Sequence, residues 1–310
     1  MRPGEIVALL TDSVRDFARD ECPTQAAALS YYTIFSLPPL LAVLLLILGS
    51  VLDPHDVQGQ LEQQIGALMG PTAAEQIRTI LQQAHRPEAR GALATVLSVG
   101  ALVVGATGAF GQLQAALNRA WEVAPDPAQG GLKQFLLKRV FSFGMVFIVA
   151  FFLLVSLAVS AALSAFGGAL GAMLPDTVSA TLLQVINQVV SLAVVSVLFA
   201  ALFKVLPDAR VAWRDVWVGA FVTAVLFVVG KFLIGYYLGR TNPGQAFGAA
   251  ASLAVLFVWV YYSSMILLFG AEFTESWADR RGSGIAPERG AVRVVEEKRL
   301  VRQARPVSAR

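Results

Sequence analysis

The chain has 310 residues, of which 56% are hydrophobic and 15% are charged, whereas a typical soluble domain is roughly 25% charged. Its charged side chains are confined to short zones, and the uncharged runs between them exceed the ~20 residues that cross a bilayer as a helix. These features exclude a soluble globule, a disordered chain and a fibrous repeat, and a single cysteine and two histidines exclude an internal disulfide and a histidine-rich metal site.

Residues 1–21 are predicted to form a short amphipathic helix. Ile6, Leu10, Val14 and Phe17 recur at helical spacing, opposite charged residues. Acidic residues interrupt the segment, so we expect no cleaved signal peptide. The apolar stripe fits two interpretations, a helix lying at the membrane surface or a helix packed against a bundle, and the sequence leaves both open.

Six long runs that are free or nearly free of charge predict six transmembrane helices. They are apolar on all sides, which is typical of helices covered by lipid or by other helices. The runs are Cys22–Leu52, Gly91–Asn118, Val140–Pro175, Thr177–Phe203, Val216–Gly239 and Thr241–Ala271. Ten-residue strands of alternating polarity are absent from the sequence. We therefore expect an all-α polytopic membrane domain over residues 22–278, with an external amphipathic insertion at 53–90.

The distribution of Lys and Arg predicts the orientation of the spans. Nineteen of these residues fall on the side of the two termini and four fall on the other side. Because cytoplasmic loops accumulate Lys and Arg, both termini are expected in the cytoplasm.

The first two spans contain the features that most affect helix shape and packing. Pro38 and Pro39 predict a kink in the first span because neither residue donates a backbone hydrogen bond. Such kinks occur in transporter binding sites and also in membrane helices without that role. In the second span, Ala101, Gly105 and Ala109 form a stripe of small residues where another helix can approach closely.

Polar side chains gather at the predicted cytoplasmic end of the second span. Gln112, Gln114 and Asn118 lie there, followed by Arg119. Amides at this depth either bind the head group of a translocated substrate or tie helices together.

Two further charged residues lie in or beside the spans. Lys231 interrupts the fifth span, and its side chain either reaches out to the lipid head groups or faces the bundle. Glu272 closes the sixth span, where it could cap a loop or pair with a basic group such as Arg119.

Residues 279–310 are predicted to be a basic, disordered cytoplasmic tail. From Arg280 on, nine basic residues face three glutamates, a net charge of +6. Such a segment binds anionic lipid, or its basic residues only set the orientation of the spans in the membrane. Nucleic acid is not an expected partner, because no aromatic residues alternate with the basic ones to stack on bases.

Four segments in the order of the chain carry a family resemblance: QAAALSYYTIFSLPPLL, FGQLQAALNRAWEV, KVLPDARVAWRDVWVGA and FGAAASLAVLFVWVYYSSMILLFGAEF. Together they resemble the YihY/BrkB family of bacterial inner-membrane proteins, some of which were formerly named ribonuclease BN. The resemblance runs from about Glu21 to Ala278. One departure is Phe247-Gly248, where members usually have Tyr-Gly. The resemblance implies a multi-pass protein of the bacterial cytoplasmic membrane, associated with envelope integrity or virulence and with the movement of lipid-like substrates, and it implies no catalytic residues.

The leading functional hypothesis is a transporter or flippase-like protein for an amphiphilic or anionic envelope component. It rests on the kinked first span, the polar cluster and Lys231. No nucleotide-binding motif is present, so an ion gradient, a partner or the substrate's own gradient would supply the energy. The alternative is a non-transporting scaffold that binds an envelope protein. A membrane-bound nuclease is a remote third hypothesis, because clustered cytoplasmic metal ligands are lacking. We therefore predict a protein that is not an enzyme, binds membrane lipids and needs no cofactor or metal; homo-oligomerisation stays open.

Overall fold

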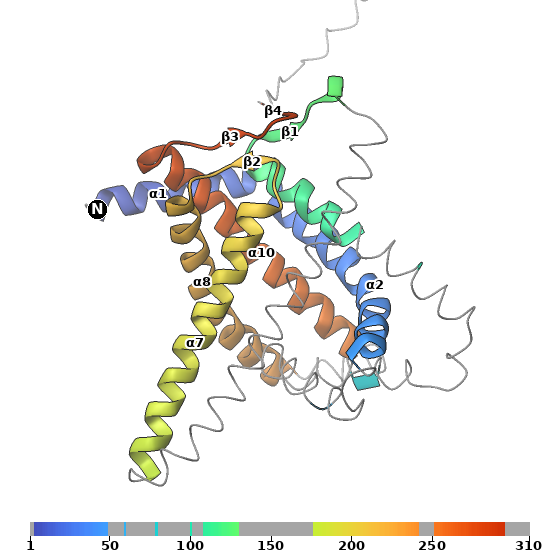
Figure 1. The fold of residues 1–310 in the computed structure, drawn as a ribbon. Helices are drawn as coiled ribbons and strands as arrows, with labels where there is room; N and C mark the ends of the chain where they lie inside the picture. The colour runs from blue at the N-terminus through green and yellow to red at the C-terminus, as the bar shows by residue number, and fades with distance from the viewer. Residues whose placement is uncertain are drawn as a thin grey trace, which may run out of the picture.

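The structure is a computed structural model that describes residues 3–48, 59, 78–79, 100, 108–129, 176–241 and 251–294. This part of the chain is mostly helical (Figure 1). Its long helices are α1 (Pro3–Arg19), α2 (Cys22–Leu48), a helix over 108–120, α7 (Asp176–Val205), α8 (Trp213–Thr241) and α10 (Ala251–Arg281). Four short strands and one 3₁₀ turn complete it: β1 (Val123–Pro125), η2 (Pro127–Gln129), β2 (Ala209–Arg210), β3 (Ala286–Pro287) and β4 (Ala291–Arg293).

Three of the described helices are long and apolar enough to cross a membrane. The candidate spans are Gln188–Val205, Trp213–Tyr237 and Leu253–Arg281. They overlap the fourth, fifth and sixth predicted runs and each extends beyond one end of its run, so the prediction of an α-helical membrane protein is confirmed at that level. The predicted third span and almost all of the external insertion at 53–90 lie outside the described residues.

α2 is a single helix through Pro38 and Pro39. The prolines therefore do not break the first predicted span into two helices. The side chain of Pro38 is exposed, and that of Pro39 lies outside the described residues.

α8 and α10 contact each other closely through two matched glycine–threonine pairs. A Cβ on Gly219 would lie 1.8 Å from Oγ1 of Thr274, and a Cβ on Gly270 would lie 1.9 Å from Oγ1 of Thr223. Each threonine hydroxyl is satisfied within its own helix, by the carbonyl four residues earlier, at 2.7 Å for Thr223 and 2.6 Å for Thr274. The absence of side chains at the two glycines therefore lets the helix backbones approach.

Several connections between helices lie at one end of the bundle. Here α2 and α8 begin, while the 108–120 helix, α7 and α10 end, and α1 lies across them (Figure 1). We call this the loop end. Trp121 is fully buried there; its indole nitrogen donates to the carbonyl of Ala271 at 3.0 Å, and its ring meets that of Phe203 edge-on at 6.1 Å.

α1 divides its apolar surface between two surroundings. Leu9 is buried, and Phe17 packs edge-on against Phe269 of α10 with ring centres 5.9 Å apart. Ile6, Leu10 and Val14 stay exposed. Of the predicted stripe, Phe17 packs against the bundle, and the three exposed residues remain available for another surface.

Two ion pairs join the first turn and the middle of α1 to the end of α10. Arg281 lies 2.7 Å from Glu5, and Arg280 pairs with Asp12. Both pairs join residues on the rim of the loop end.

The chain returns across the loop end after α10. β3 pairs antiparallel with β2, with Ala209 opposite Pro287, and β4 pairs antiparallel with β1, with Ala124 opposite Val292. We call residues 282–294 the strap. Gly284 and Gly290 have φ of 71° and 85°, so the turns of the strap use a conformation that glycine adopts without strain.

The strap corrects one prediction. The sequence predicted a disordered tail from residue 279, yet residues 279–281 complete α10 and the strap pairs with two loops. The charge pattern wrongly indicated disorder. Short strands pair through backbone hydrogen bonds, so their side chains can be basic and exposed. Residues 295–310 lie outside the described part of the chain.

A candidate polar pocket at the loop end

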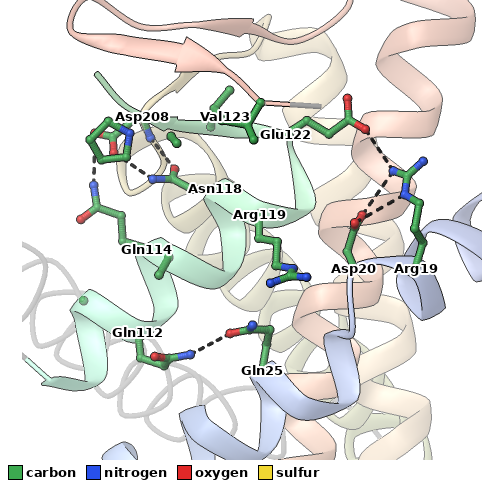
Figure 2. Close-up of a pocket in the computed structure, with 15 residues that line it drawn as sticks. Arg19, Asp20, Gln25, Gln112, Gln114, Asn118, Arg119, Glu122, Val123 and Asp208 are labelled. Carbon is green, nitrogen blue, oxygen red and sulfur yellow. Dashed lines mark hydrogen bonds and ion pairs between the residues drawn. The ribbon is translucent and has the colours of Figure 1, made fainter. Parts of the chain in front are cut away.

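A pocket of about 700 Å³ opens at the loop end. Its walls come from the turn between α1 and α2, the 108–120 helix, β1, the connection before β2, and the end of the strap (Figure 2). The lining residues are Arg19, Asp20, Gln25, Gly111, Gln112, Gln114, Ala115, Asn118, Arg119, Glu122, Val123, Ala124, Pro125, Asp208 and Val294. Segments far apart in the sequence therefore build one cavity with polar and apolar walls.

The inner side of the pocket is closed by two contacts between α2 and the 108–120 helix. The amide nitrogen of Gln112 donates to the amide oxygen of Gln25 at 2.8 Å. A Cβ on Gly108 would lie 2.9 Å from the ring of Tyr32, so the two helices approach closely there. Gln25 and Tyr32 are about two helical turns apart on one face of α2, and Gln112 and Gly108 are about one turn apart on one face of the facing helix.

Asp208 organises the opposite side of the pocket. Its carboxylate accepts hydrogen bonds from Asn118 Nδ2 at 2.8 Å and from Gln114 Nε2 at 3.2 Å, and its backbone N–H donates to Asn118 Oδ1 at 2.8 Å. Its carbonyl accepts from the backbone N–H of Glu288 in the strap at 2.9 Å. One residue thus joins the 108–120 helix, the connection between α7 and α8, and the strap.

Ion pairs form the rim of the pocket. Arg19 lies 3.3 Å from Asp20 and 3.2 Å from Glu122 (Figure 2). Glu122 also lies 3.2 Å from Arg293 of the strap. Burial raises the pKa of Asp16, and Arg19 opposes that shift from 3.3 Å. Since the arginines are about half exposed, these pairs hold the rim weakly.

Two turns beside the pocket have a residue in the left-handed region. Glu21, after α1, has φ of 55°, and Glu122, after the 108–120 helix, has φ of 51°. Glu21 lies 3.8 Å from Arg119, and Glu122 lines the pocket. Non-glycine residues adopt this conformation at a cost of roughly 1 kcal/mol, so the surrounding contacts hold both turns in place.

Arg119 is the cation nearest the middle of the pocket. Its side chain extends from the 108–120 helix toward the α1–α2 side, between Gln25 and Asp20 (Figure 2). Together with the amides, it gives the pocket donors suited to phosphate and hydroxyl oxygens. Among the described residues, no group of three or more His, Cys, Asp or Glu side chains could hold a metal ion.

The structure brings together four of the six polar residues singled out in the sequence. Gln112, Gln114, Asn118 and Arg119 all line the pocket. The three amides also tie chain segments together through Gln25 and Asp208, so both interpretations of the cluster have a structural basis.

The other two polar candidates lie elsewhere. Lys231 is half-buried on α8, with Nζ 5.7 Å from the centre of the Phe232 ring. Glu272 is buried on α10 and accepts a hydrogen bond from the thiol of Cys22 at 3.2 Å.

The predicted packing stripe is described only at its last residue. Ala109 is half-buried, while Ala101 and Gly105 lie outside the described residues. In the described part, the closest glycine contacts belong to α8 and α10.

Sequence reasoning missed Asp208 and Gln25. Asp208 follows a proline in the short connection between two predicted spans. A carboxylate next to a helix end is a signal from which it could have been recognised as a site residue. Gln25 sits in the first turn of a predicted span, one of few polar groups there. For both residues, the sequence does not indicate which other segment of the chain they contact.

Comparison with known proteins identifies a family whose profile covers most of the chain. The profile of the family described as "Virulence factor BrkB" matches residues 13–293. The chain belongs to this family. The match ends at the last residue of β4, so the strap belongs to the family region, although the resemblance seen in the sequence ended at Ala278.

The curated relatives of this BrkB-family chain are named as membrane proteins. A UPF0761 membrane protein of Pseudomonas paraeruginosa is 30% identical over 256 residues, which are 82% of this chain and 59% of the relative. One from Psychromonas ingrahamii is 27% identical over 258 residues, 83% of this chain and 82% of the relative. The chain thus spans about three fifths of the length of the Pseudomonas relative. No solved structure matches the chain.

Proposed function

We propose that the protein is a transporter or flippase-like protein that moves an amphiphilic or anionic envelope component across the bacterial cytoplasmic membrane. In this proposal six helices cross the membrane, and the loop end and both termini face the cytoplasm. The observation that carries the proposal is the pocket of about 700 Å³ at the loop end, lined by amides and by Arg119.

The chemistry of the pocket suits a polar head group. Phosphate and hydroxyl oxygens accept hydrogen bonds from amide N–H groups and from guanidinium. The lining supplies both kinds of donor beside three carboxylates, and its apolar side chains, Ala115, Val123, Ala124, Pro125 and Val294, would contact the apolar part of an amphiphile. A substrate with an oxygen-rich head group would therefore exchange hydrogen bonds with water for similar bonds with the pocket.

The surroundings of the pocket suit an apolar tail and an opening rim. Tyr31 and Phe35 are exposed on α2, below the turn that contributes to the pocket. They offer an apolar surface on which an acyl chain could lie. The rim pairs of Arg19 and Arg293 with Glu122 are solvent-exposed, so opening them costs about 0–1 kcal/mol each.

Proteoliposomes containing a fluorescent phospholipid test the proposal. The protein is expected to increase movement of the lipid between leaflets above that in empty vesicles. Arg119→Gln should lower this rate by roughly tenfold or more, because it removes a charge-assisted hydrogen bond worth about 1.5–3 kcal/mol. Arg289→Gln is the matched control, since Arg289 is exposed on the strap away from the lining, and it should behave as wild type.

Two results would contradict transport. One is lipid movement equal to that in empty vesicles, and the other is equal loss of activity in both arginine variants. A series of lipids with phosphate, polyol and zwitterionic head groups would then show whether another amphiphile is moved.

A scaffold is the second candidate, and the hydrogen bonds around Asp208 favour it. In that interpretation, the amides tie the loop end into a rigid surface for an envelope protein. Crosslinking would recover a stable protein partner, and Arg119→Gln would leave that partner bound. Anionic lipid at the basic tail suits either candidate.

A further inference from the structure

A buried carboxyl group lies next to the pocket but does not line it. Glu272 on α10 has no exposed surface. Its Oε1 accepts a hydrogen bond from Cys22 Sγ at 3.2 Å, and its Oε2 is buried without a hydrogen-bond partner among the described residues. A thiol is a weak donor, so this partner does little to stabilise a negative charge.

The groups around Glu272 are mostly acidic. The charges acting on it come from Asp16 of α1, from Asp20 in the turn before α2, and from Glu275 on α10 itself. Cys22 begins α2, and Arg119 of the 108–120 helix acts on that thiol. Ionised Glu272 would thus be shielded from solvent and near other carboxylates, which is costly. A proton on Oε2 removes this cost.

The turn between α1 and α2 connects Glu272 with the pocket. Asp20 lines the pocket and is one of the charges that act on Glu272, and Cys22 contacts Glu272 two residues later. A change in the pocket that moves this turn would change both the charge near Glu272 and its access to water.

We propose that Glu272 and Cys22 form a proton-binding site that couples movement of the pocket's substrate to a transmembrane proton gradient. This inference rests on the proposed transport function. The carboxylate takes up one proton at Oε2 when the site is open to water on one side of the membrane. It gives up the same proton on the other side, and the thiol keeps the carboxyl group oriented through Oε1. No electron transfer is involved.

Infrared spectroscopy of the full-length protein in proteoliposomes tests proton binding without any substrate. The carbonyl stretch of a protonated carboxyl group is expected at neutral pH and should decrease reversibly as the pH is raised. Glu275 is a second buried carboxyl on α10 and contributes to the same spectral region, so Glu272→Gln should remove one component of the band and Glu275→Gln should leave that component in place. Cys22→Ala should shift the band, because Oε1 loses its donor.

Three infrared results would overturn the proposal. The band could be absent at every pH, it could lose no component in Glu272→Gln, or it could stay constant at all pH values at which the protein remains folded. The last result would mark a permanently neutral packing group.

A second measurement tests coupling. Lipid movement is compared with and without an imposed pH difference across the vesicle membrane, and the ratio of the two rates is recorded. The ratio should exceed unity for wild type and for the exposed variant Glu288→Gln, and it should fall to unity for Glu272→Gln. An unchanged ratio in Glu272→Gln refutes coupling. If the wild-type protein moves no lipid, the transport proposal fails, and the infrared titration still decides whether Glu272 binds a proton.

Discussion

The contact between α8 and α10 and the loop end are held together by opposite means. Between the two helices, Gly219 faces Thr274 and Gly270 faces Thr223, and no room exists for a methyl group. At the loop end, a cavity of about 700 Å³ remains, and hydrogen bonds centred on Asp208 connect the segments.

The difference indicates which kind of substitution each region tolerates. A close helix contact depends on volume, so adding a single carbon atom disrupts it whatever its polarity. A hydrogen-bonded junction depends on donors and acceptors, so a change that keeps the volume but removes an acceptor disrupts it. The first region is suited to a fixed element, and the second can rearrange if its bonds are exchanged for others.

Gly219→Ala is expected to have the largest effect. The new Cβ would meet both Oγ1 and Cβ of Thr274, at 1.8 and 2.8 Å, so the helices must separate. We expect a loss of about 3 kcal/mol in the free energy of unfolding, the upper part of the range for overpacked cores. Denaturant unfolding in detergent micelles measures it.

Gly235→Ala is the matched control on the same helix. Nothing lies within 4 Å of a Cβ at that position, so alanine should be neutral or stabilise by up to about 1 kcal/mol. Adding Thr274→Ala to Gly219→Ala should recover part of the loss. Equal stability of Gly219→Ala and wild type would show that the close contact does not exist.

Asp208→Ala is expected to have the next largest effect, at the loop end. It removes the acceptor for Asn118 and Gln114 and leaves their amides without it, at a cost of about 2 kcal/mol. The strap should open more often, so trypsin should cut after Arg289 and Arg293 faster. Glu288→Ala, a change at an exposed side chain of the strap itself, should leave the cleavage rate unchanged. Equal rates for Asp208→Ala and wild type would contradict the role of Asp208.

Gly282→Ala should weaken the start of the strap by a smaller amount. A Cβ there would lie 2.2 Å from Oδ2 of Asp215, a buried carboxylate in the first turn of α8. Because a short side chain can rotate partly away, we expect a loss of about 1 kcal/mol, the low end for overpacking. The same tryptic assay measures it, with the exposed Ser283→Ala as control. Faster cleavage in the control than in Gly282→Ala would count against the contact.

The smallest expected effect concerns α1. If the exposed part of its apolar stripe lies in the membrane surface, a spin label at Leu10 should be reached by oxygen from the lipid more than by a polar relaxation agent. A label at Arg15, exposed on the polar side, should show the reverse. The buried Cys22 should stay unlabelled. Equal accessibility at both sites would mean that the stripe faces water or another protein.

The sequence predicted the positions of the helices much better than the tertiary contacts between them. Long uncharged runs dictate helices in lipid because each backbone bond must be satisfied within the segment, and α7, α8 and α10 follow from that rule. The cluster of Gln112, Gln114, Asn118 and Arg119 was visible because amides are rare in such runs. Asp208 was not recognised as its partner, since 90 residues separate it from Asn118 and no local pattern records a tertiary contact.

The strap and the proton site illustrate two further limits. β3 and β4 have two and three residues, too few for any periodic signal, and their pairing is fixed by the loops that they meet. Glu272 was expected to cap a loop or pair with a basic group such as Arg119, whereas it accepts a hydrogen bond from Cys22. Its burial depends on how α1 and α2 fold over α10, which hydropathy alone does not determine.

The ladders at the loop end also impose an order on biogenesis. β1 and β2 leave the ribosome long before β4 and β3, the strands with which they pair. Their edges therefore stay unpaired until α10 and then residues 282–294 have been synthesised. The cavity is therefore finished only after translation of the strap. In a truncation or reporter fusion placed just after α10, the edges of β1 and β2 would stay unpaired, and chaperones and proteases could bind them.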